Sequence, residues 1–297
     1  VRHAWEMYVR FLVAAVFVVF LSSASLAEQR VALVIGVGEY DALRPLKNPR
    51  NDARAMDEIL YDLGFDVDMV TDRDLVRLGR ALEQFSEDAE DADLAVIYFA
   101  GHGMEVDGEN LLFARDAAAG NIEELKATAL PLADVVAAVS AARAGLLLID
   151  ACRTDAFGVP VGDASRGSFT LEEDVSPGLG RIGRADKLVY AFAAAPGQGA
   201  LDGEGENSPF AAALVRHLGT SGLEVRTALT LVQQDVYDRT RGVQLPYVES
   251  GLPGLFFVSE TPGDLPERER LLLAMAEIDD TPRRDVERVA SDADMPL

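Results

Sequence analysis

Short continuous runs of apolar residues alternate along the chain with segments whose apolar residues recur at helical spacing. The continuous runs predict buried strands at 31–37, 65–70, 94–100, 146–149, 188–194 and 255–258. The periodic segments predict helices at 51–63, 75–85, 132–142, 209–218 and 225–237. Strands that are apolar throughout and alternate with helices are typical of a mostly parallel sheet covered on both faces. We therefore predict an α/β fold with a mostly parallel central sheet.

The start of the chain has the pattern of an export leader. Arg2 and Arg10 precede an apolar run at 11–21, and the segment 22–27 that follows ends in the small-x-small pattern of a cleavage site. This order predicts a signal peptide over 1–27 and therefore a periplasmic or secreted protein. An apolar run of 11 residues is too short to span a bilayer, so we expect no stable membrane anchor after the leader is removed. An uncleaved anchor is the competing interpretation.

The remaining residues are expected to form one domain and a tail. The predicted strands and helices lie within 28–260, whereas 261–297 is acidic and interrupted by prolines, so we expect this tail to be peripheral. Apolar residues make up 49% of the chain, which is enough for a core. The net charge of −23 argues against nucleic acid as a partner, because nucleic acid requires a basic surface. An acidic surface suits a cationic partner, although solubility alone explains most of the charge.

A single cysteine, Cys152, is present in the sequence. It cannot form an internal disulfide, so it is either a buried inert residue or a thiol with a chemical role. Cys152 and His102 each follow a predicted buried strand, and His102 lies between Gly101 and Gly103. In sheets of this kind, sites form at the carboxyl ends of the strands. We therefore predict that His102 is a base that activates the Cys152 thiol, whereas His217 falls on a predicted helix and has a structural role.

Two motifs resemble those of a known family. Tyr-Phe-Ala-Gly-His-Gly at 98–103 and Ile-Asp-Ala-Cys-Arg at 149–153 resemble the histidine and cysteine motifs of caspase-like cysteine peptidases. The bacterial metacaspase-like (orthocaspase) branch is the most similar. The likeness spans 30–258, with further segments in the family's order at 46–53, 106–110, 195–198 and 208–210.

This resemblance implies a caspase-like three-layer sandwich and a dyad of His102 and Cys152 without an obligatory third acid. It implies hydrolysis of polypeptides through a thioester acyl-enzyme, with an oxyanion hole made by the backbone N–H groups of Gly103 and Cys152. No cofactor is required for this chemistry, and no Cys/His cluster has the spacing of a zinc site. Some relatives respond to calcium, which leaves calcium activation open, although no stretch follows an EF-hand pattern.

Three acidic residues predict which peptide bond is cut. Asp150 stands two residues before the cysteine, where caspases carry Gln, and Asp202 aligns with an arginine of the caspase primary pocket. The metacaspase resemblance adds Asp52. An acidic pocket favours Arg or Lys before the scissile bond and repels Asp. The alternatives are a helix-start acid for Asp52, a strand-end residue bonding local backbone for Asp150, and a solvated turn for Asp202.

The segment 154–186 lacks clear periodicity and contains Arg166, Arg181 and Arg184. A peptidase specific for basic residues could process itself after one of them, and a flexible loop with scattered charge is the other interpretation. Two further functions remain open for the domain as a whole. One is a binding or scaffold module whose dyad is unused, against which the intact His102 and Cys152 count, and the other is transpeptidation at the same dyad.

Overall fold

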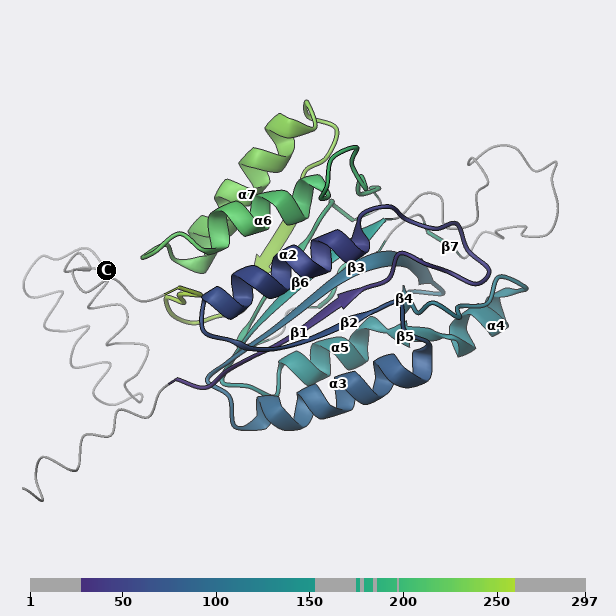
Figure 1. The fold of residues 1–297 in the computed structure, drawn as a ribbon, viewed down its shortest axis with the longest axis horizontal. Coiled ribbons are helices and arrows are strands. Elements are labelled where there is room, and N and C mark those ends of the chain that lie inside the picture. The colour runs from purple at the N-terminus through teal and green to yellow at the C-terminus, as the bar shows by residue number, and fades with distance from the viewer. Residues whose placement is uncertain (1–27, 153–174, 177–178, 184–185, 197, 260–297) are drawn as a thin grey trace, which may run out of the picture.

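A mostly parallel sheet forms the centre of the protein (Figure 1). The structure, a computed structural model, describes residues 28–152, 175–176, 179–183, 186–196 and 198–259. The predicted leader and the whole of the predicted tail therefore lie outside the described residues. Neighbouring strands follow the order β2-β1-β3-β6-β8-β9. Their bounds are β1 (Arg30–Gly36), β2 (Asp66–Thr71), β3 (Leu94–Val106), β6 (Ala144–Cys152), β8 (Leu188–Phe192) and the antiparallel edge strand β9 (Tyr247–Ser250).

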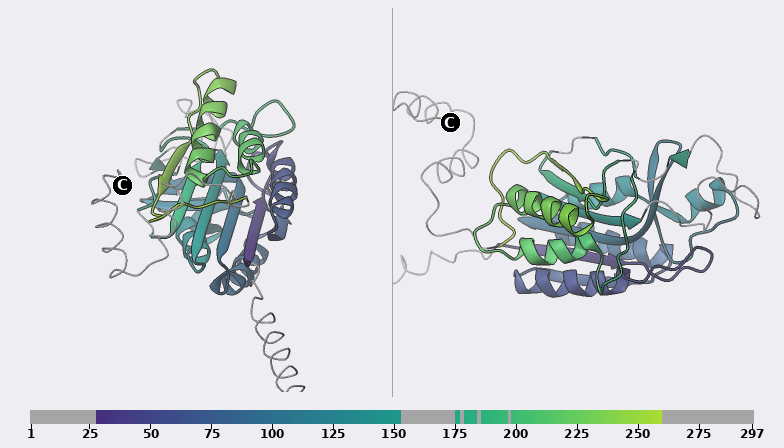
Figure 2. Two further views of the ribbon diagram at one scale, coloured as in Figure 1. Left: turned by 90° about the vertical axis from the view of Figure 1, so that its left-hand side faces the viewer. Right: turned by 90° about the horizontal axis from the view of Figure 1, so that it is seen from above.

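Helices cover both faces of this sheet (Figures 1 and 2). One face carries α2 (Pro49–Asp62), α6 (Pro209–Leu218) and α7 (Val225–Arg239), and the other carries α3 (Leu75–Glu90) and α5 (Leu132–Val139). None of the helices within the described ranges is long and apolar enough to cross a membrane. The three-layer α/β sandwich predicted from the sequence is confirmed.

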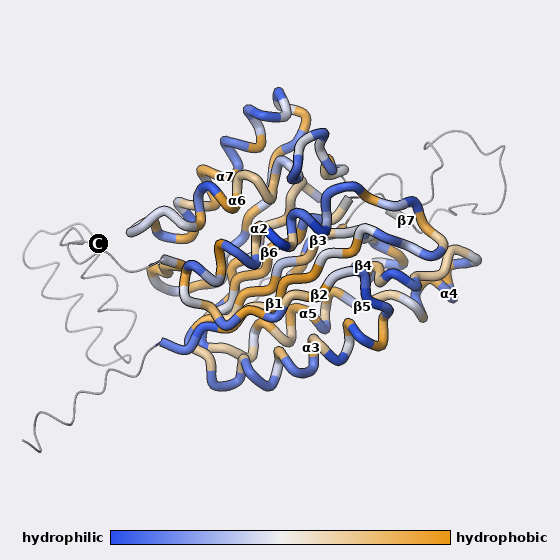
Figure 3. Tube along the Cα trace, in the orientation of Figure 1, coloured by the Kyte–Doolittle hydropathy of each residue, from blue (hydrophilic) through white to orange (hydrophobic). Residues whose placement is uncertain are grey.

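The strands are apolar throughout because successive residues face opposite layers. Val34 and Val96 pack against the α2 and α6 side, whereas Leu33 and Ile97 pack against the α3 and α5 side. Figure 3 shows the result as a band of hydrophobic strands between helices whose outer faces are polar. Even-numbered positions of β3 therefore belong to the α2 side, the side on which His102 falls.

A small antiparallel extension lies beyond the carboxyl end of the parallel sheet. After His102, β3 pairs with β4 (Glu109–Phe113) and β7 (Val175–Ser176), and β4 pairs with β5 (Ala129–Pro131), which follows the short helix α4 (Ile122–Ala127). Leu43, Met104 and Phe113 belong to the separate apolar cluster of this extension. These short elements were not predicted, because each is too short for periodicity to distinguish it from a loop.

The strand predicted at 255–258 is wrong. Phe257 makes an isolated bridge with Glu224, and the last strand of the sheet is β9. The side chains of β9 are all half-buried, so this strand has no continuous apolar run in the sequence. The apolar residues Phe256 and Val258 pack instead against the helical layer that contains α7.

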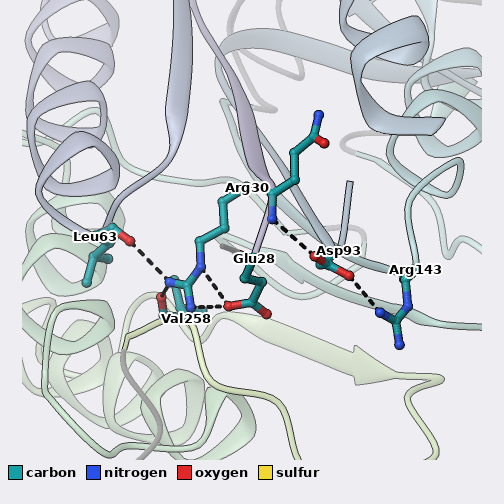
Figure 4. A network of polar contacts seen from close by, with 7 residues as sticks. Glu28, Arg30, Leu63, Asp93, Arg143 and Val258 are labelled. Atoms are coloured by element: carbon teal, nitrogen blue, oxygen red, sulfur yellow. Dashed lines mark hydrogen bonds and ion pairs between the residues drawn. The ribbon is translucent and has the colours of Figure 1, made fainter. Parts of the chain in front are cut away.

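Polar contacts join the two ends of the domain at the amino-terminal ends of the parallel strands (Figure 4). Arg30, the first residue of β1, donates to the carbonyl of Leu63 at 3.1 Å and to the carbonyl of Val258 at 2.8 Å. Beside it, the carboxylate of Asp93 accepts from the backbone N–H of Gln29 at 3.1 Å and from Arg143 at 2.7 Å. His102 lies at the opposite, carboxyl-terminal ends of these strands.

Candidate active site

The register of the two central strands pairs His102 with Cys152. Neighbouring strands lie about 4.8 Å apart, so the backbones of these two residues are side by side. The sequence placed both residues just after a strand, and this placement is wrong in detail. β3 runs through His102 to Val106, and β6 includes Cys152 as its last residue. The site is nevertheless at the carboxyl end of the parallel sheet, because β1 pairs with β3 only as far as Ala100.

His102 is 2% exposed, and its ring is oriented by a backbone carbonyl. Nε2 lies 2.8 Å from the carbonyl oxygen of Arg44. A carbonyl oxygen only accepts hydrogen bonds, so Nε2 carries the ring proton and Nδ1 holds the lone pair in the neutral imidazole. Nδ1 is then the nitrogen that can take a proton from an attacking group.

Tyr40, which lies with Arg44 in the loop between β1 and α2, also contacts His102. The backbone N–H of His102 donates to the Tyr40 hydroxyl at 2.7 Å, and the two rings lie 4.7 Å apart between centroids. A Cβ at Gly101 would approach that hydroxyl to 2.9 Å, so this position has no room for a side chain. Neither Tyr40 nor Arg44 was found from the sequence. A loop carbonyl has no residue-type signal, and Tyr40 lies outside the apolar periodicity.

The predicted oxyanion donors, the backbone N–H groups of Gly103 and Cys152, belong to the two adjacent strands. A Cβ at Gly103 would lie 3.2 Å from the Cβ of Ala151 and 3.1 Å from the carbonyl oxygen of Leu111. A residue without a side chain therefore allows the backbones to approach closely at this point. Their role as oxyanion donors stays a prediction.

Asp150 lies in β6, two residues before Cys152, and its side chain is buried. Its carboxylate accepts a short hydrogen bond from the hydroxyl of Ser208 and a second from the Tyr98 hydroxyl at 3.3 Å. Ser208 is the N-cap of α6, and its oxygen also accepts from the backbone N–H of Ala211 at 2.9 Å. The partners of Asp150 are thus side-chain hydroxyls rather than local backbone, which departs from the alternative that the sequence left open.

Asp52 lies in the first turn of α2 and reaches the same serine. One carboxylate oxygen accepts from the backbone N–H of Ser208 at 2.9 Å and from the side-chain amide of Asn207 at 3.0 Å. The N-cap position of α2 is Asn48, so Asp52 is a first-turn acid and not a cap. Ser208 therefore connects two buried carboxylates, Asp52 and Asp150. The sequence marked Ser208 only as the start of the family segment at 208–210 and did not single out Asn207.

Burial raises the pKa of both carboxyls. It raises the pKa of Asp52 to about 7, with a further contribution from the charge of Asp202. Burial and the charge of Asp52 raise the pKa of Asp150 to about 8. Two close carboxylates that are taken out of water favour a proton or another cation between them. Around neutral pH the pair is therefore suited to a cationic side chain, which would displace the proton.

Asp202 lies close to this pair but has its own backbone partners. Its carboxylate accepts from the N–H of Lys47 at 2.8 Å and from the N–H of Asn48 at 3.2 Å, just before α2 begins. The Lys47 ammonium donates in turn to the carbonyls of Glu204 and Gly205 at 2.8 and 3.0 Å. Asp202 thus fixes the loop against the start of α2, which is more than the solvated turn considered as its alternative. Its contact with a substrate stays a prediction.

Of the three arginines considered for self-processing, Arg181 is described and Arg166 and Arg184 lie outside the described residues. The guanidinium of Arg181 lies over the ring of Tyr247 at 5.6 Å. Among the described residues, no group of three or more His, Cys, Asp or Glu side chains is arranged to hold a metal ion. Calcium activation stays a prediction.

Comparisons with known proteins agree with this fold. A family model described as "Caspase domain" matches residues 29–257. Caspase-1 from Spodoptera frugiperda has a similar structure, with a TM-score of 0.57, 22% identity, and coverage of 80% of this chain and 92% of that chain. The structure of pro-sf-caspase-1 has a TM-score of 0.56 at 20% identity, covering 79% of this chain and 92% of the other.

At these identities the two structures show the fold alone. A search of curated proteins gives no match. The family match covers most of the sequence, including both strands that carry His102 and Cys152. The chain therefore belongs to the caspase-domain family of cysteine peptidases.

Proposed function

We propose that the protein is an exported cysteine endopeptidase that cleaves polypeptides after Arg or Lys. His102 acts as the base, Cys152 as the nucleophile, and Asp150 and Asp52 hold the basic side chain. The observation that carries the proposal is the pairing of His102 with Cys152 in the register of β3 and β6. The bacterial metacaspase-like branch and the export leader remain predictions from the sequence.

The chemistry follows from the tautomer of His102. With its Nε2 proton held by the Arg44 carbonyl, Nδ1 accepts the proton of the Cys152 thiol. The thiolate then attacks the carbonyl carbon of the scissile bond, and the negative oxygen that forms is stabilised by the N–H groups of Gly103 and Cys152. Collapse breaks the C–N bond, and the imidazolium gives its proton to the departing amine. The product of this half-reaction is a thioester acyl-enzyme.

Deacylation uses the same groups. Water enters where the amine left, Nδ1 removes one of its protons, and the oxygen attacks the thioester. The thiolate leaves and recovers a proton from the imidazolium, so His102 and Cys152 return to their initial states. An amine in place of water would give transpeptidation, which is distinguished by product analysis.

Specificity rests on the buried pair of carboxylates. Asp150 comes directly before the last two residues of β6, so it is close to the position of the nucleophile along the same strand. Asp52 reaches it from α2 through Ser208. A guanidinium or ammonium placed there gains charge-assisted hydrogen bonds, whereas an Asp side chain is repelled.

The direct test is turnover of fluorogenic peptides that end in Arg, Lys, Asp or Leu before the reporter, with and without calcium. We expect hydrolysis of the Arg and Lys peptides by the wild type and its loss in Cys152→Ala and His102→Ala. His217→Gln is a matched control, because this histidine contacts Asp235 on the helical layer and not the dyad. Faster cleavage of the Asp peptide would contradict the pocket, and no turnover of any peptide would favour the binding module.

A further inference from the structure

The loop between β1 and α2, residues 37–48, provides the Tyr40 hydroxyl and the Arg44 carbonyl that contact His102. Val37 still bonds along the edge of β3, donating its N–H to the carbonyl of Ala100 at 2.8 Å. Beyond this point β1 has ended, so it provides no backbone acceptor for the N–H of His102. The Tyr40 hydroxyl takes that place at 2.7 Å. On the β1 side, the histidine is thus held by the loop and not by a strand.

A single carboxylate holds the start of this loop. Asp72 follows β2 directly, and one of its side-chain oxygens accepts from two successive backbone N–H groups, those of Gly38 and Glu39, both at 2.8 Å. Its other oxygen pairs with Arg50 in the first turn of α2. The backbone N–H of Asp72 donates to the carbonyl of Gly36 at 2.9 Å. One residue therefore joins the end of β1, the loop and α2.

The arrangement is built for this contact. Asp72 has a φ of +49°, a left-handed conformation that Asp tolerates better than most residues, and its side chain is 9% exposed. Its carboxylate accepts hydrogen bonds from Gly38 and Glu39, the two residues that immediately precede Tyr40 in the chain. Farther along, Leu43 is buried in the cluster of the antiparallel extension. The position of the Tyr40 hydroxyl is therefore set from both sides of the loop.

We propose that Asp72 and Tyr40 form a positioning unit for His102. Asp72 holds the start of the loop, and Tyr40 fixes the backbone of the histidine and packs against its ring. The inference rests on the proposed role of His102 as the base. The positioning unit acts first through geometry, because a displacement of a reacting group by about 1 Å can lower a rate about 100-fold.

Tyr40 contributes a second effect through its ring. When His102 accepts the thiol proton it becomes an imidazolium, and the Tyr40 ring lies 4.7 Å from it between centroids. A cation near an aromatic ring is stabilised by the ring electrons. Loss of the ring therefore disfavours the charged form of the dyad, whereas loss of the hydroxyl alone releases the backbone N–H.

The test uses two readouts on the full chain, peptide turnover and alkylation of Cys152 by iodoacetamide as a function of pH. Because the sequence contains one cysteine, the mass increase reports on this thiol alone. The variants are Tyr40→Phe, Tyr40→Leu, Asp72→Asn and Asp72→Ala. Asp93→Asn is the matched control, since Asp93 also joins a backbone N–H to an arginine, but at the opposite edge of the sheet (Figure 4).

We expect kcat to fall about 10-fold in Tyr40→Phe with little change in KM, a part of the roughly 100- to 10,000-fold that a general base contributes. The kcat of Tyr40→Leu and of Asp72→Ala should be lower still, and the pH profiles of Cys152 alkylation in these two variants should move to higher pH. Asp72→Asn keeps an oxygen for the two N–H groups and should recover part of the rate. It also serves as the test where Asp72→Ala does not fold. Asp93→Asn should change thermal stability but not the alkylation profile.

Two results would separate the possible failures. Wild-type kcat and alkylation profiles in Tyr40→Phe, Tyr40→Leu and Asp72→Asn would overturn the positioning unit and leave the dyad in place. Turnover that survives in His102→Ala and Cys152→Ala would overturn the proposed function itself. A profile shift in Asp93→Asn equal to those in Tyr40→Leu and Asp72→Ala would show that general destabilisation, and not positioning, is responsible.

Discussion

Ser208 and Asp150 are 58 residues apart in the sequence and meet through a hydrogen bond from the serine hydroxyl to the carboxylate. The same serine donates its backbone N–H to Asp52 at 2.9 Å. Two carboxylates from different layers of the fold are thereby brought together beside the predicted nucleophile. This connection makes their ionisation a property of the pair, and it leads to several measurable consequences.

The first prediction concerns the pH dependence of catalysis. Burial raises the pKa of Asp52 to about 7 and that of Asp150 to about 8, so below these values the pocket holds protons that an incoming guanidinium must displace. We expect kcat/KM for Arg peptides to rise as the pH increases from 6 to about 8.5, more steeply than the rate of Cys152 alkylation. In Asp52→Asn the two pH profiles should come closer together, because one of the two titrating carboxyls is gone and the charge that raised the pKa of Asp150 is removed with it. Equal steepness in the wild type would contradict the prediction.

A second prediction concerns stability. Both carboxyls have a raised pKa in the folded state, so they bind more protons there than in the unfolded chain. Their contribution is therefore fully present below the ordinary carboxyl pKa of about 4, and it is lost progressively until the pH has risen through about 7 to 8. The difference in the free energy of unfolding, variant minus wild type, should therefore become more positive for Asp52→Asn between pH 5 and pH 9. About 1.4 kcal/mol per pKa unit sets the scale of this gain. Denaturant unfolding at the two pH values measures it, and a constant difference would contradict it.

The third prediction separates substrate binding from thiol activation. Asp150→Asn removes the charge that would face a basic side chain and keeps the shape of the residue. We expect kcat/KM for Arg and Lys peptides to fall about 10- to 100-fold, mainly through KM, as for a lost buried charge pair. Alkylation of Cys152 should keep its wild-type rate. An equal loss for Arg and Leu peptides would show that Asp150 supports the dyad instead of the pocket.

The fourth prediction concerns self-processing. The segment around Arg181 is anchored, since Gly180 exchanges hydrogen bonds with the Asn110 side chain at 2.6 and 3.3 Å. The carbonyl of Ile182 accepts from the Tyr190 hydroxyl at 2.8 Å. Cleavage requires local release of the backbone, so we expect no cut after Arg181.

Intact-mass analysis tests this prediction. Fragments should appear in the wild type, be absent in Cys152→Ala and be unchanged in Arg181→Ala, whereas substitution of Arg166 or Arg184 should remove them. Fragments in both the wild type and Cys152→Ala would point to another peptidase. Their loss in Arg181→Ala alone would contradict the argument from anchoring.

The sequence predicted the parallel layers well because their signals are strong. The run at 31–37 corresponds to β1, because a strand buried on both faces is apolar at every position. The periodic segment at 209–218 corresponds to α6, because a helix that packs on a sheet is apolar along one face. The missed strand β9 has four half-buried side chains, so its position depends on pairing with β8 and not on local pattern.

The candidate site divides in the same way. His102, Cys152 and Asp150 could be predicted because they follow apolar strands and occur in recognisable motifs. The partners of the site residues come from loops and helix ends that are distant in the sequence, such as the Arg44 carbonyl beside His102 and the N–H of Ser208 beside Asp52. Backbone atoms are common to all residues, so no residue pattern marks the ones that a site uses.

Cleavage of a peptide library by the wild type and by Cys152→Ala decides whether the protein is a cysteine peptidase specific for basic residues. We expect cuts after Arg and Lys by the wild type, none after Asp, and no cuts by the variant. Cuts after Asp, or cuts that persist in Cys152→Ala, would contradict this expectation.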